Sequence, residues 1–443
     1  MSGTDKGQAT IPTPTIIPRS AHTISRAGIS KNALRVLYRL KEAGFEAYLV
    51  GGGVRDLLLG REPKDFDVAT DAHPDQVRHL FRNCRLIGRR FRLAHVHFGP
   101  EIVEVATFRA VNAGDSDGDG GWETVDGRIV RDNVYGTFEQ DACRRDFTVN
   151  ALYYNIRDFS VVDFSTGLED LRAGVIRLIG DPDVRLREDP VRMLRAVRFA
   201  AKLGLRIDPE IEVRLPRMAS LLADIPAARL YEEVLKLLQG GFGVQAFELL
   251  RHYDLFGYLF PATEQCLAEE EGGFPRMLIV RALQGTDGRV ATGKPVTPAF
   301  LFAALLWEPM RRAEARFREA GEPPARAFAL AAEAVMTDQS RTVAFPRRFA
   351  AVTQDIWALQ PRLVQTSGRR PARLLEHPRF RAGYDFLVMR AAAGEEVHDL
   401  VNWWTAFQEA DEAGRADLLK PEARRPRRRP RRRRRARTET AAP

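Results

Sequence analysis

The sequence has little cysteine and no long apolar run. Its three cysteines, Cys84, Cys143 and Cys266, are scattered through 443 residues, and no two of them form a CxxC pair. This pattern argues against a disulfide framework and against a structural zinc site, and it favours a reducing compartment. No apolar run is long enough to span a bilayer. Residues 1–20 are polar and interrupted by prolines, unlike the apolar region of a signal peptide. We therefore expect a cytoplasmic protein with no membrane partner.

Positive charge is concentrated at one end of the chain. Residues 421–443 contain eleven arginines and two glutamates, which equals the whole net charge of +9. Such a segment repels itself and has no apolar residue larger than alanine or proline with which to form a core, so we expect it to be disordered on its own. The dominance of arginine over lysine favours binding to a phosphate backbone, in a salt-sensitive and sequence-independent way.

The pattern of apolar residues predicts an α+β protein. Strand-like segments alternate with helical ones up to about residue 164, whereas helical periodicity dominates beyond residue 185. A helix is expected to start after Ser30 and to stop at Gly44. The predicted strands are Ala47–Val50, Phe66–Ala69, Arg85–Ile87, Leu93–Phe98, Ile102–Phe108 and Ala151–Asn155. The predicted organisation is a disordered lead (1–29), an α/β head with a mixed sheet (30–175), a helical neck (176–265), a helical body (266–415) and a disordered basic tail (416–443).

Two chemical features lie close together near the start of the head. A glycine-rich turn, Gly51-Gly52-Gly53, would let backbone N–H groups approach a phosphate. About a dozen residues later, Asp65 and Asp67 occupy alternate positions of an extended segment, so their side chains share one face and could share divalent cations. Carboxylates beside a phosphate-binding turn suit metal-assisted phosphoryl or nucleotidyl transfer.

This arrangement, YLVGGGVRDLLLGREPKDFDVAT, resembles the nucleotidyltransferase superfamily that contains bacterial poly(A) polymerases and CCA-adding tRNA nucleotidyltransferases. Residues 144–152, RRDFTVNAL, look like the ribose-selecting motif of that family. Residues 188–195, EDPVRMLR, look like its nucleobase-recognition motif. The resemblance covers residues 45–205 and extends more loosely to LLEHPRFRAGYDFL near residue 380.

The resemblance implies a nucleotidyltransferase head with ATP as substrate and two Mg²⁺ ions. Asp65 and Asp67 are the predicted catalytic metal ligands. A third carboxylate is expected, and the sequence leaves two candidates open. Glu104 lies in the EVATFR segment, where related enzymes carry a carboxylate near the metals, whereas Asp146 belongs to the RRD motif and has either a catalytic or a ribose-binding role.

Arginines and glycines supply the predicted nucleotide contacts. Arg144 and Arg145 would offer guanidinium groups to triphosphate oxygens. Glu188 and Asp189 precede Pro190 at an expected helix start, and Asp189 and Arg192 would recognise the edge of a nucleobase. The complete set of predicted nucleotide-binding residues is Gly51, Gly52, Arg55, Arg144, Arg145, Asp189, Arg192, Arg195 and Arg198.

The favoured function is a template-independent polynucleotide adenylyltransferase, which adds AMP from ATP to RNA 3′ ends and so marks RNA for turnover. The arginine-rich end and the LLEHPRFRAGYD segment favour this branch of the family. One alternative is a CCA-adding tRNA nucleotidyltransferase, since the active-site motifs serve both activities. A second is a non-catalytic RNA-binding protein. Proteins of RNA turnover are expected partners, whereas the sequence does not indicate an oligomeric state.

Overall fold

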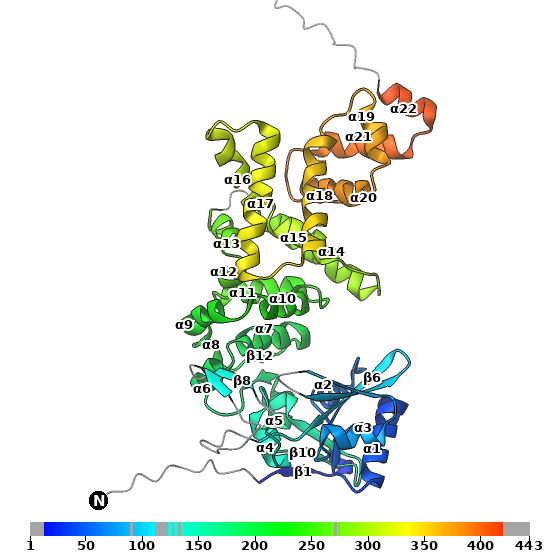
Figure 1. Cartoon of the computed structure of the whole chain (residues 1–443), viewed down its shortest axis with the longest axis vertical. Coiled ribbons are helices and arrows are strands. Elements are labelled where there is room, and N and C mark those ends of the chain that lie inside the picture. Colours follow the sequence, from blue (N-terminus) through cyan, green and yellow to red (C-terminus); the bar gives the residue numbers. More distant parts are fainter. Residues whose placement is uncertain are drawn as a thin grey trace, which may run out of the picture. The chain divides into compact units, whose positions relative to one another are not determined.

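The computed structural model describes residues 13–88, 92–110, 123–125, 128–131, 134–269, 273 and 275–419 (Figure 1). The chain divides into two compact units, the first ending at Ala351 and the second beginning at Val352. The first unit contains an eight-stranded mixed sheet, and the described residues of the second unit are helical or irregular. The predicted α+β class is therefore confirmed. The predicted boundaries at residues 175 and 265 both lie inside the first unit and stay predictions.

The sheet of the first unit has the strand order β1-β10-β9-β2-β3-β6-β5-β4. Neighbouring strands are antiparallel except β3 and β6, which are parallel. The strands are β1 (Thr15–Ile17), β2 (Ala47–Val50), β3 (Asp67–Thr70), β4 (Cys84–Ile87), β5 (Leu93–Phe98), β6 (Glu101–Thr107), β9 (Leu152–Asn155) and β10 (Val161–Asp163). Two small additional sheets pair β7 (Glu123–Val125) with β8 (Arg128–Arg131), and β11 (Val175–Ile176) with β12 (Arg206–Ile207).

Helices cover both faces of this sheet. One face is covered by α1 (Lys31–Glu42) and α3 (Pro74–Leu80), which contact strands β2 to β6. The other face carries α4 (Phe138–Arg144), where Phe138 and Ala142 pack with Val50 and Tyr153 of the central strands. Ser30 caps α1 by accepting a hydrogen bond from the backbone N–H of Ala33 at 2.9 Å. This cap confirms the predicted helix start.

Helices form the rest of the first unit. They begin with α2 (Gly52–Leu58), which follows the glycine turn, and α5 (Gly167–Ala173). Nucleobase-recognition candidates lie on or beside α6 (Pro182–Glu188) and α7 (Val191–Leu203). The remaining helices are α8 (Pro209–Glu212), α9 (Leu215–Met218), α10 (Ala227–Leu238), α11 (Gly243–His252), α12 (Phe256–Leu259), α13 (Pro261–Ala268), α14 (Arg276–Ala291), α15 (Pro298–Leu305), α16 (Trp307–Glu319) and α17 (Pro324–Thr342).

The second unit is a small helical assembly built on its own core. It contains most of α18 (Arg347–Leu363), with α19 (Arg370–Leu375), α20 (Phe380–Ala392), α21 (His398–Glu409) and α22 (Glu412–Leu418). Leu363, Leu374, Phe380 and Trp404 are buried together. The Trp404 indole Nε1 also donates a hydrogen bond to the carbonyl of Leu363 at 2.8 Å, which joins α21 to the end of α18.

The structure corrects both predicted disordered ends. The expected lead of residues 1–29 is wrong for its second half, because Thr15–Ile17 forms edge strand β1 and pairs with β10. The expected tail of residues 416–443 is wrong at its start, because α22 extends to Leu418. The arginine-rich residues 421–443 lie outside the described residues. Within the described part of the chain, no helix is long and apolar enough to cross a membrane.

Candidate active site

A row of residues across five adjacent strands forms the base of the candidate site. In the sheet register, His95 of β5 is opposite Glu104 of β6, and Glu104 is beside Asp67 of β3. The row continues through Val50 of β2 to Tyr153 of β9. Paired residues point to the same face of a sheet, so the Asp67 and Glu104 carboxylates lie on the face that carries α4. Asp65 precedes β3, which starts at Asp67 rather than at the predicted Phe66.

The glycine turn follows directly after this row. Gly51 has a φ of +73°, a conformation that favours glycine. A Cβ atom at Gly51 would lie 3.8 Å from Nη1 of Arg145 and 3.9 Å from Oδ2 of Asp67. A cationic group and an anionic group therefore both lie beside the turn. This is the arrangement expected for a triphosphate bound at the turn with metal ions on its carboxylate side.

Arg145 is held in place by the residues around it. Its Nε donates to the Tyr153 hydroxyl at 2.7 Å, and its Nη2 donates to Asp141 at 3.1 Å. Burial alone would lower the pKa of Arg145, but its interactions with Tyr153 and Asp141 raise that pKa above its ordinary value. The guanidinium is thus charged and oriented, with Nη1 on the side of Gly51.

Electrostatics around Asp67 favour a bound cation. Burial raises the pKa of Asp67 to about 6, and the nearby negative charges of Glu104 and Asp65 act in the same direction. Glu104 also interacts with His95, whose Nε2 lies 3.2 Å from its Oε2. A divalent ion between these carboxylates would offset their mutual repulsion.

The carboxylates are not grouped as a finished metal site. Among the described residues, no three His, Cys, Asp or Glu side chains lie closely enough together to hold a metal ion as they stand. Asp65, Asp67 and Glu104 nevertheless provide the oxygen ligands that Mg²⁺ prefers. Their role as metal ligands stays a prediction, supported by the register and by the charge around Asp67.

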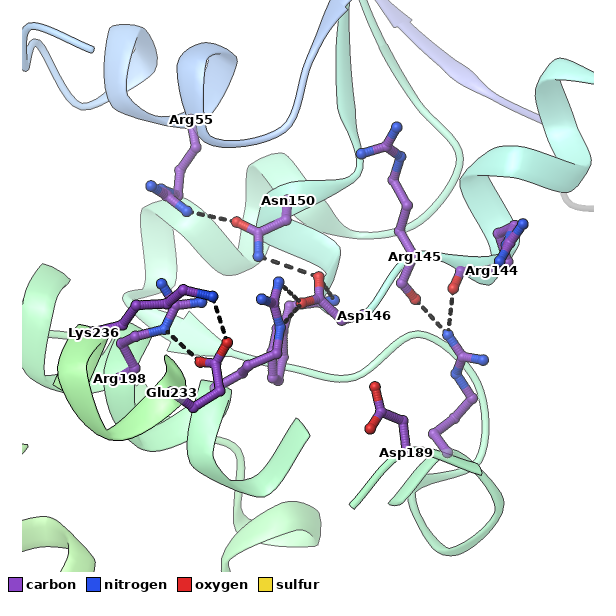
Figure 2. A network of polar contacts seen from close by, with 12 residues as sticks. Arg55, Arg144, Arg145, Asp146, Asn150, Asp189, Arg198, Glu233 and Lys236 are labelled. Atoms are coloured by element: carbon purple, nitrogen blue, oxygen red, sulfur yellow. Dashed lines mark hydrogen bonds and ion pairs between the residues drawn. The ribbon is translucent and has the colours of Figure 1, made fainter. Parts of the chain in front are cut away.

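Asp146, the other candidate carboxylate, is engaged in a different contact. Its Oδ2 accepts hydrogen bonds from Nε of Arg195, at 2.8 Å, and from Nη2 of Arg195, at 2.5 Å. Its Oδ1 accepts from Asn150 at 3.2 Å, and Asn150 in turn accepts from Nη1 of Arg55 at 2.6 Å (Figure 2). Burial raises the pKa of Asp146, but the charge and hydrogen bonds of Arg195 outweigh that effect and lower the pKa to about 2. Asp146 therefore connects α2, through Asn150 and Arg55, to α7, through Arg195.

Arg55 lies at the other end of this network and is buried, with 2% of its surface exposed. Its Nε donates to Asp56 at 2.9 Å, in addition to the contact with Asn150. These contacts satisfy its guanidinium within the fold. The predicted direct contact between Arg55 and the nucleotide stays a prediction, and the buried position of Arg55 does not support it.

The three predicted arginines of α7 each pair with a carboxylate from a different element. Arg195 pairs with Asp146, as described above. The other two pairs are Arg192 with Glu188 of α6, at 2.9 Å, and Arg198 with Glu233 of α10, at 3.5 Å. Lys236 also contacts Glu233, at 2.7 Å (Figure 2). The row of arginines thus connects α7 to the head and to two helices of the same unit.

The helix start predicted at Pro190, after Glu188 and Asp189, is confirmed to within one residue, because Pro190 is the N-cap residue of α7. Glu188 is the last residue of α6, and α7 begins at Val191 after Pro190. Asp189 lies in the turn between the two helices, where its Oδ1 accepts from the backbone N–H of Val191 at 3.3 Å. Its Oδ2 lies 2.6 Å from Nη2 of Arg229. The Asp189 side chain is 21% exposed in this turn.

Arg185 connects this turn to the RRD segment, and the sequence did not single it out. Its Nη2 donates to the backbone carbonyls of Arg144 and Arg145, at 2.6 Å each, and its Nη1 pairs with Glu188 at 2.5 Å. The predicted triphosphate and nucleobase segments are therefore directly linked. Asn150, Arg229 and Glu233 were also missed. Asn150 lies within the RRDFTVNAL segment, whereas the other two carry no local signal.

Comparisons with known proteins agree with this geometry. Family models match residues 47–177 ("Poly A polymerase head domain"), 204–267 ("Probable RNA and SrmB- binding site of polymerase A") and 320–438 ("Polymerase A arginine-rich C-terminus"). Poly(A) polymerase I of Escherichia coli O6:H1 is 53% identical over 429 residues, covering 94% of this chain and 92% of that protein. The chain belongs to the poly(A) polymerase family. The family resemblance predicted from the sequence is confirmed.

CCA-adding enzymes are more distant relatives of this poly(A) polymerase family member. The CCA-adding enzyme of Lactobacillus helveticus is 39% identical over 217 residues, which is 49% of this chain and 52% of that enzyme. The fold is also similar to the crystal structure of Bacillus stearothermophilus CCA-adding enzyme in complex with CTP. That match has a TM-score of 0.56 at 27% identity and covers 84% of this chain and 80% of the other. The nucleotidyltransferase fold of the head is thus common to both branches.

Proposed function

We propose that this chain adds AMP from ATP to RNA 3′ ends without a template. The observation that carries the proposal is the site around Gly51, where the oriented guanidinium of Arg145 and the carboxylate of Asp67 both lie beside the turn and Glu104 is next to Asp67 in the sheet. Poly(A) polymerase I relatives that match most of the chain support adenylyl transfer as the reaction. The site supplies the groups that such a transfer needs. A direct transfer of this kind proceeds without a covalent enzyme intermediate.

In the proposed reaction, the RNA 3′ oxygen forms a bond to the α-phosphorus of ATP. The bond between that phosphorus and the oxygen that leads to the β-phosphate breaks, pyrophosphate leaves, and the proton of the hydroxyl passes to solvent. Asp65, Asp67 and Glu104 would hold two Mg²⁺ ions, which neutralise charge on the phosphates and favour ionisation of the hydroxyl. Arg145 and the Gly51–Gly52 backbone would bind triphosphate oxygens.

Nucleobase recognition is assigned to the turn between α6 and α7. Asp189 would accept a hydrogen bond from the exocyclic amine of adenine, and Arg192 would donate to its ring nitrogens. In the structure these side chains contact Arg229 and Glu188 respectively. These contacts position the two side chains relative to Arg185 and hence to the RRD segment.

The alternatives have less support. The Lactobacillus helveticus CCA-adding relative matches about half of this chain, whereas the Escherichia coli poly(A) polymerase I matches 94% of it. A non-catalytic RNA-binding protein would have no need of the Asp67–Glu104 register or of an oriented Arg145. Cytoplasmic location and RNA-turnover partners stay predictions from the sequence.

A stoichiometric assay tests the proposed reaction. The full chain is incubated with an unstructured RNA, ATP and Mg²⁺, and both the AMP added and the pyrophosphate released are measured. We expect one pyrophosphate for each AMP added, with no product when Mg²⁺ is chelated. Elongation without pyrophosphate release, or no elongation by a folded protein, would contradict the proposal.

A further inference from the structure

The second unit contains a strongly basic connection between two of its helices. Residues 362–381 run from the end of α18, through α19, to the first turn of α20. They include six arginines, no lysine and one acidic residue, Glu376. Residues 395–419 of the same unit have the opposite composition, with seven acidic residues and one arginine. Charge within this small unit is therefore strongly segregated along the chain.

The connection is attached to the core of the unit at three points. Leu363, Leu374 and Phe380 are 0%, 3% and 5% exposed and belong to the core around Trp404. Backbone N–H groups of His377 and Phe380 donate to the carbonyls of Leu374 and His377, at 3.0 and 2.8 Å, which tightens the turn between α19 and α20. The apolar residues thus fix the connection, and the arginines between them extend to solvent.

Most of these arginines have no acidic partner in the part of the chain that the structure describes. Arg381 pairs with Asp385 at 2.9 Å, and Arg370 contacts the neutral side chain of Gln365. The structure shows no ion pair for the remaining four, which are all exposed: Arg362, Arg369, Arg373 and Arg379. Three exposed arginines of α16 and α17 differ, because Arg318, Arg326 and Arg341 each pair with a carboxylate three or four residues away.

We propose that Arg362, Arg369, Arg370, Arg373 and Arg379 form a binding surface for the phosphate backbone of single-stranded RNA. This proposal, which rests on the proposed function, assigns the surface to RNA that precedes the reacting 3′ end. Because the backbone is fixed, guanidinium groups on it bind phosphates without ordering the backbone, and the planar fork reduces the side-chain entropy lost for each hydrogen bond. The acidic residues 395–419 would repel RNA, so the charge pattern along the chain favours RNA contact at residues 362–379.

The composition favours RNA over a folded protein partner. Backbone recognition requires positive charge and no apolar anchor, and the arginines here flank short polar stretches such as Gln365–Ser367. Binding by this surface should be independent of RNA sequence. Removing its charge should weaken affinity and reduce the dependence of affinity on salt concentration.

The test compares two triple variants of the full chain with equal changes in charge. One carries Arg369→Gln, Arg373→Gln and Arg379→Gln, and the control carries Arg318→Gln, Arg326→Gln and Arg341→Gln. Affinity for a labelled 20-nucleotide RNA is measured by fluorescence anisotropy at several salt concentrations. We expect the first variant to bind about tenfold or more weakly at 0.1 M salt, with a slope of log affinity against log salt that is about 2 smaller in magnitude. The control should bind nearly as the wild type does.

Two further measurements make the result decisive. A third variant combines Arg369→Lys, Arg373→Lys and Arg379→Lys. It keeps the positive charge, so its RNA affinity should keep most of its dependence on salt. Melting temperatures of all variants should match that of the wild type, because the substituted side chains are exposed. Unchanged affinity and slope in the first variant would overturn the proposal, as would an equal loss of affinity in the control. If the wild type and every variant fail to add AMP but differ in RNA affinity as expected, the proposed function fails and the binding surface stands.

Discussion

Asp67 is the residue on which the proposed chemistry depends most. Replacing it with asparagine should reduce AMP addition at least a hundredfold at saturating Mg²⁺, equal to about 2.7 kcal/mol of barrier. The same change should stabilise the metal-free protein by about 1 kcal/mol, because it removes a charge that burial and Glu104 disfavour and that solvent screens in part. Primer extension and thermal unfolding measure the two effects.

A matched control for this substitution is Asp75→Asn, since the Asp75 side chain is 62% exposed on α3. It should change neither activity nor melting temperature appreciably. An Asp67→Asn protein that keeps more than about a hundredth of the wild-type rate would show that this carboxylate is not a metal ligand.

His95 is predicted to orient Glu104 for metal binding. His95→Ala should weaken Mn²⁺ binding about tenfold, measured by electron paramagnetic resonance on the nucleotide-free protein, because Glu104 loses its partner at 3.2 Å. His97→Ala is the control, because His97 lies two residues away on β5 and is opposite Ile102 rather than Glu104. Equal Mn²⁺ affinity in the two variants would show that His95 does not support the site.

At the scale of elements, α7 is joined to the head by the Arg195–Asp146 pair. Arg195→Ala should destabilise the protein by about 2–3 kcal/mol, because it leaves the largely buried Asp146 carboxylate without its partner. Combining it with Asp146→Asn should recover part of that stability, since no buried charge then remains unpaired. Urea unfolding of the single and double variants measures this recovery, and its absence would contradict the assigned role of the pair.

The same pair gives a dependence on pH. The pKa of Asp146 is about 2 in the folded protein, below its ordinary value of 3.8. Its contribution to stability is therefore complete above about pH 4 and is lost as the pH falls toward 2. The difference in unfolding free energy between the wild type and Asp146→Asn should be larger at pH 6 than at pH 3. A difference that does not change with pH would contradict this.

Elements with strong local patterns could be predicted from the sequence, and elements defined by pairing could not. Strands β2 and β5 and the start of α1 were predicted at their observed bounds because apolar alternation and a serine cap are local signals. Strand β1 was missed because it is a three-residue edge strand between Pro14 and Pro18 and depends on β10 for its hydrogen bonds.

The candidate site shows the same division. Asp65, Asp67 and Arg145 lie in recognisable motifs, so the sequence indicated them. The contact of Glu233 with Arg198 joins residues 35 positions apart on α10 and α7, and Arg229 reaches Asp189 across 40 positions. Such contacts follow from helix packing, which no local pattern reports.

At the scale of the whole molecule, charge at the end of the chain should control RNA affinity. Deleting residues 421–443 removes eleven arginines and should weaken RNA binding and reduce its salt dependence, by about 0.7 in slope for each phosphate that the protein no longer neutralises. AMP addition to a short primer at high RNA concentration should persist, because the candidate active site lies in the first unit. Anisotropy titrations at several salt concentrations measure the effect. An unchanged slope would show that these arginines do not bind RNA.

The central claim, template-independent AMP addition, is tested most directly by product length and nucleotide choice. The full chain is incubated with Mg²⁺ and either an unstructured RNA or a tRNA that lacks its 3′ CCA, with each of the four nucleoside triphosphates alone and with all four together. We predict long tails on the unstructured RNA with ATP alone and little addition with CTP, GTP or UTP. Addition confined to the tRNA that stops after CCA would contradict the account and identify a CCA-adding enzyme.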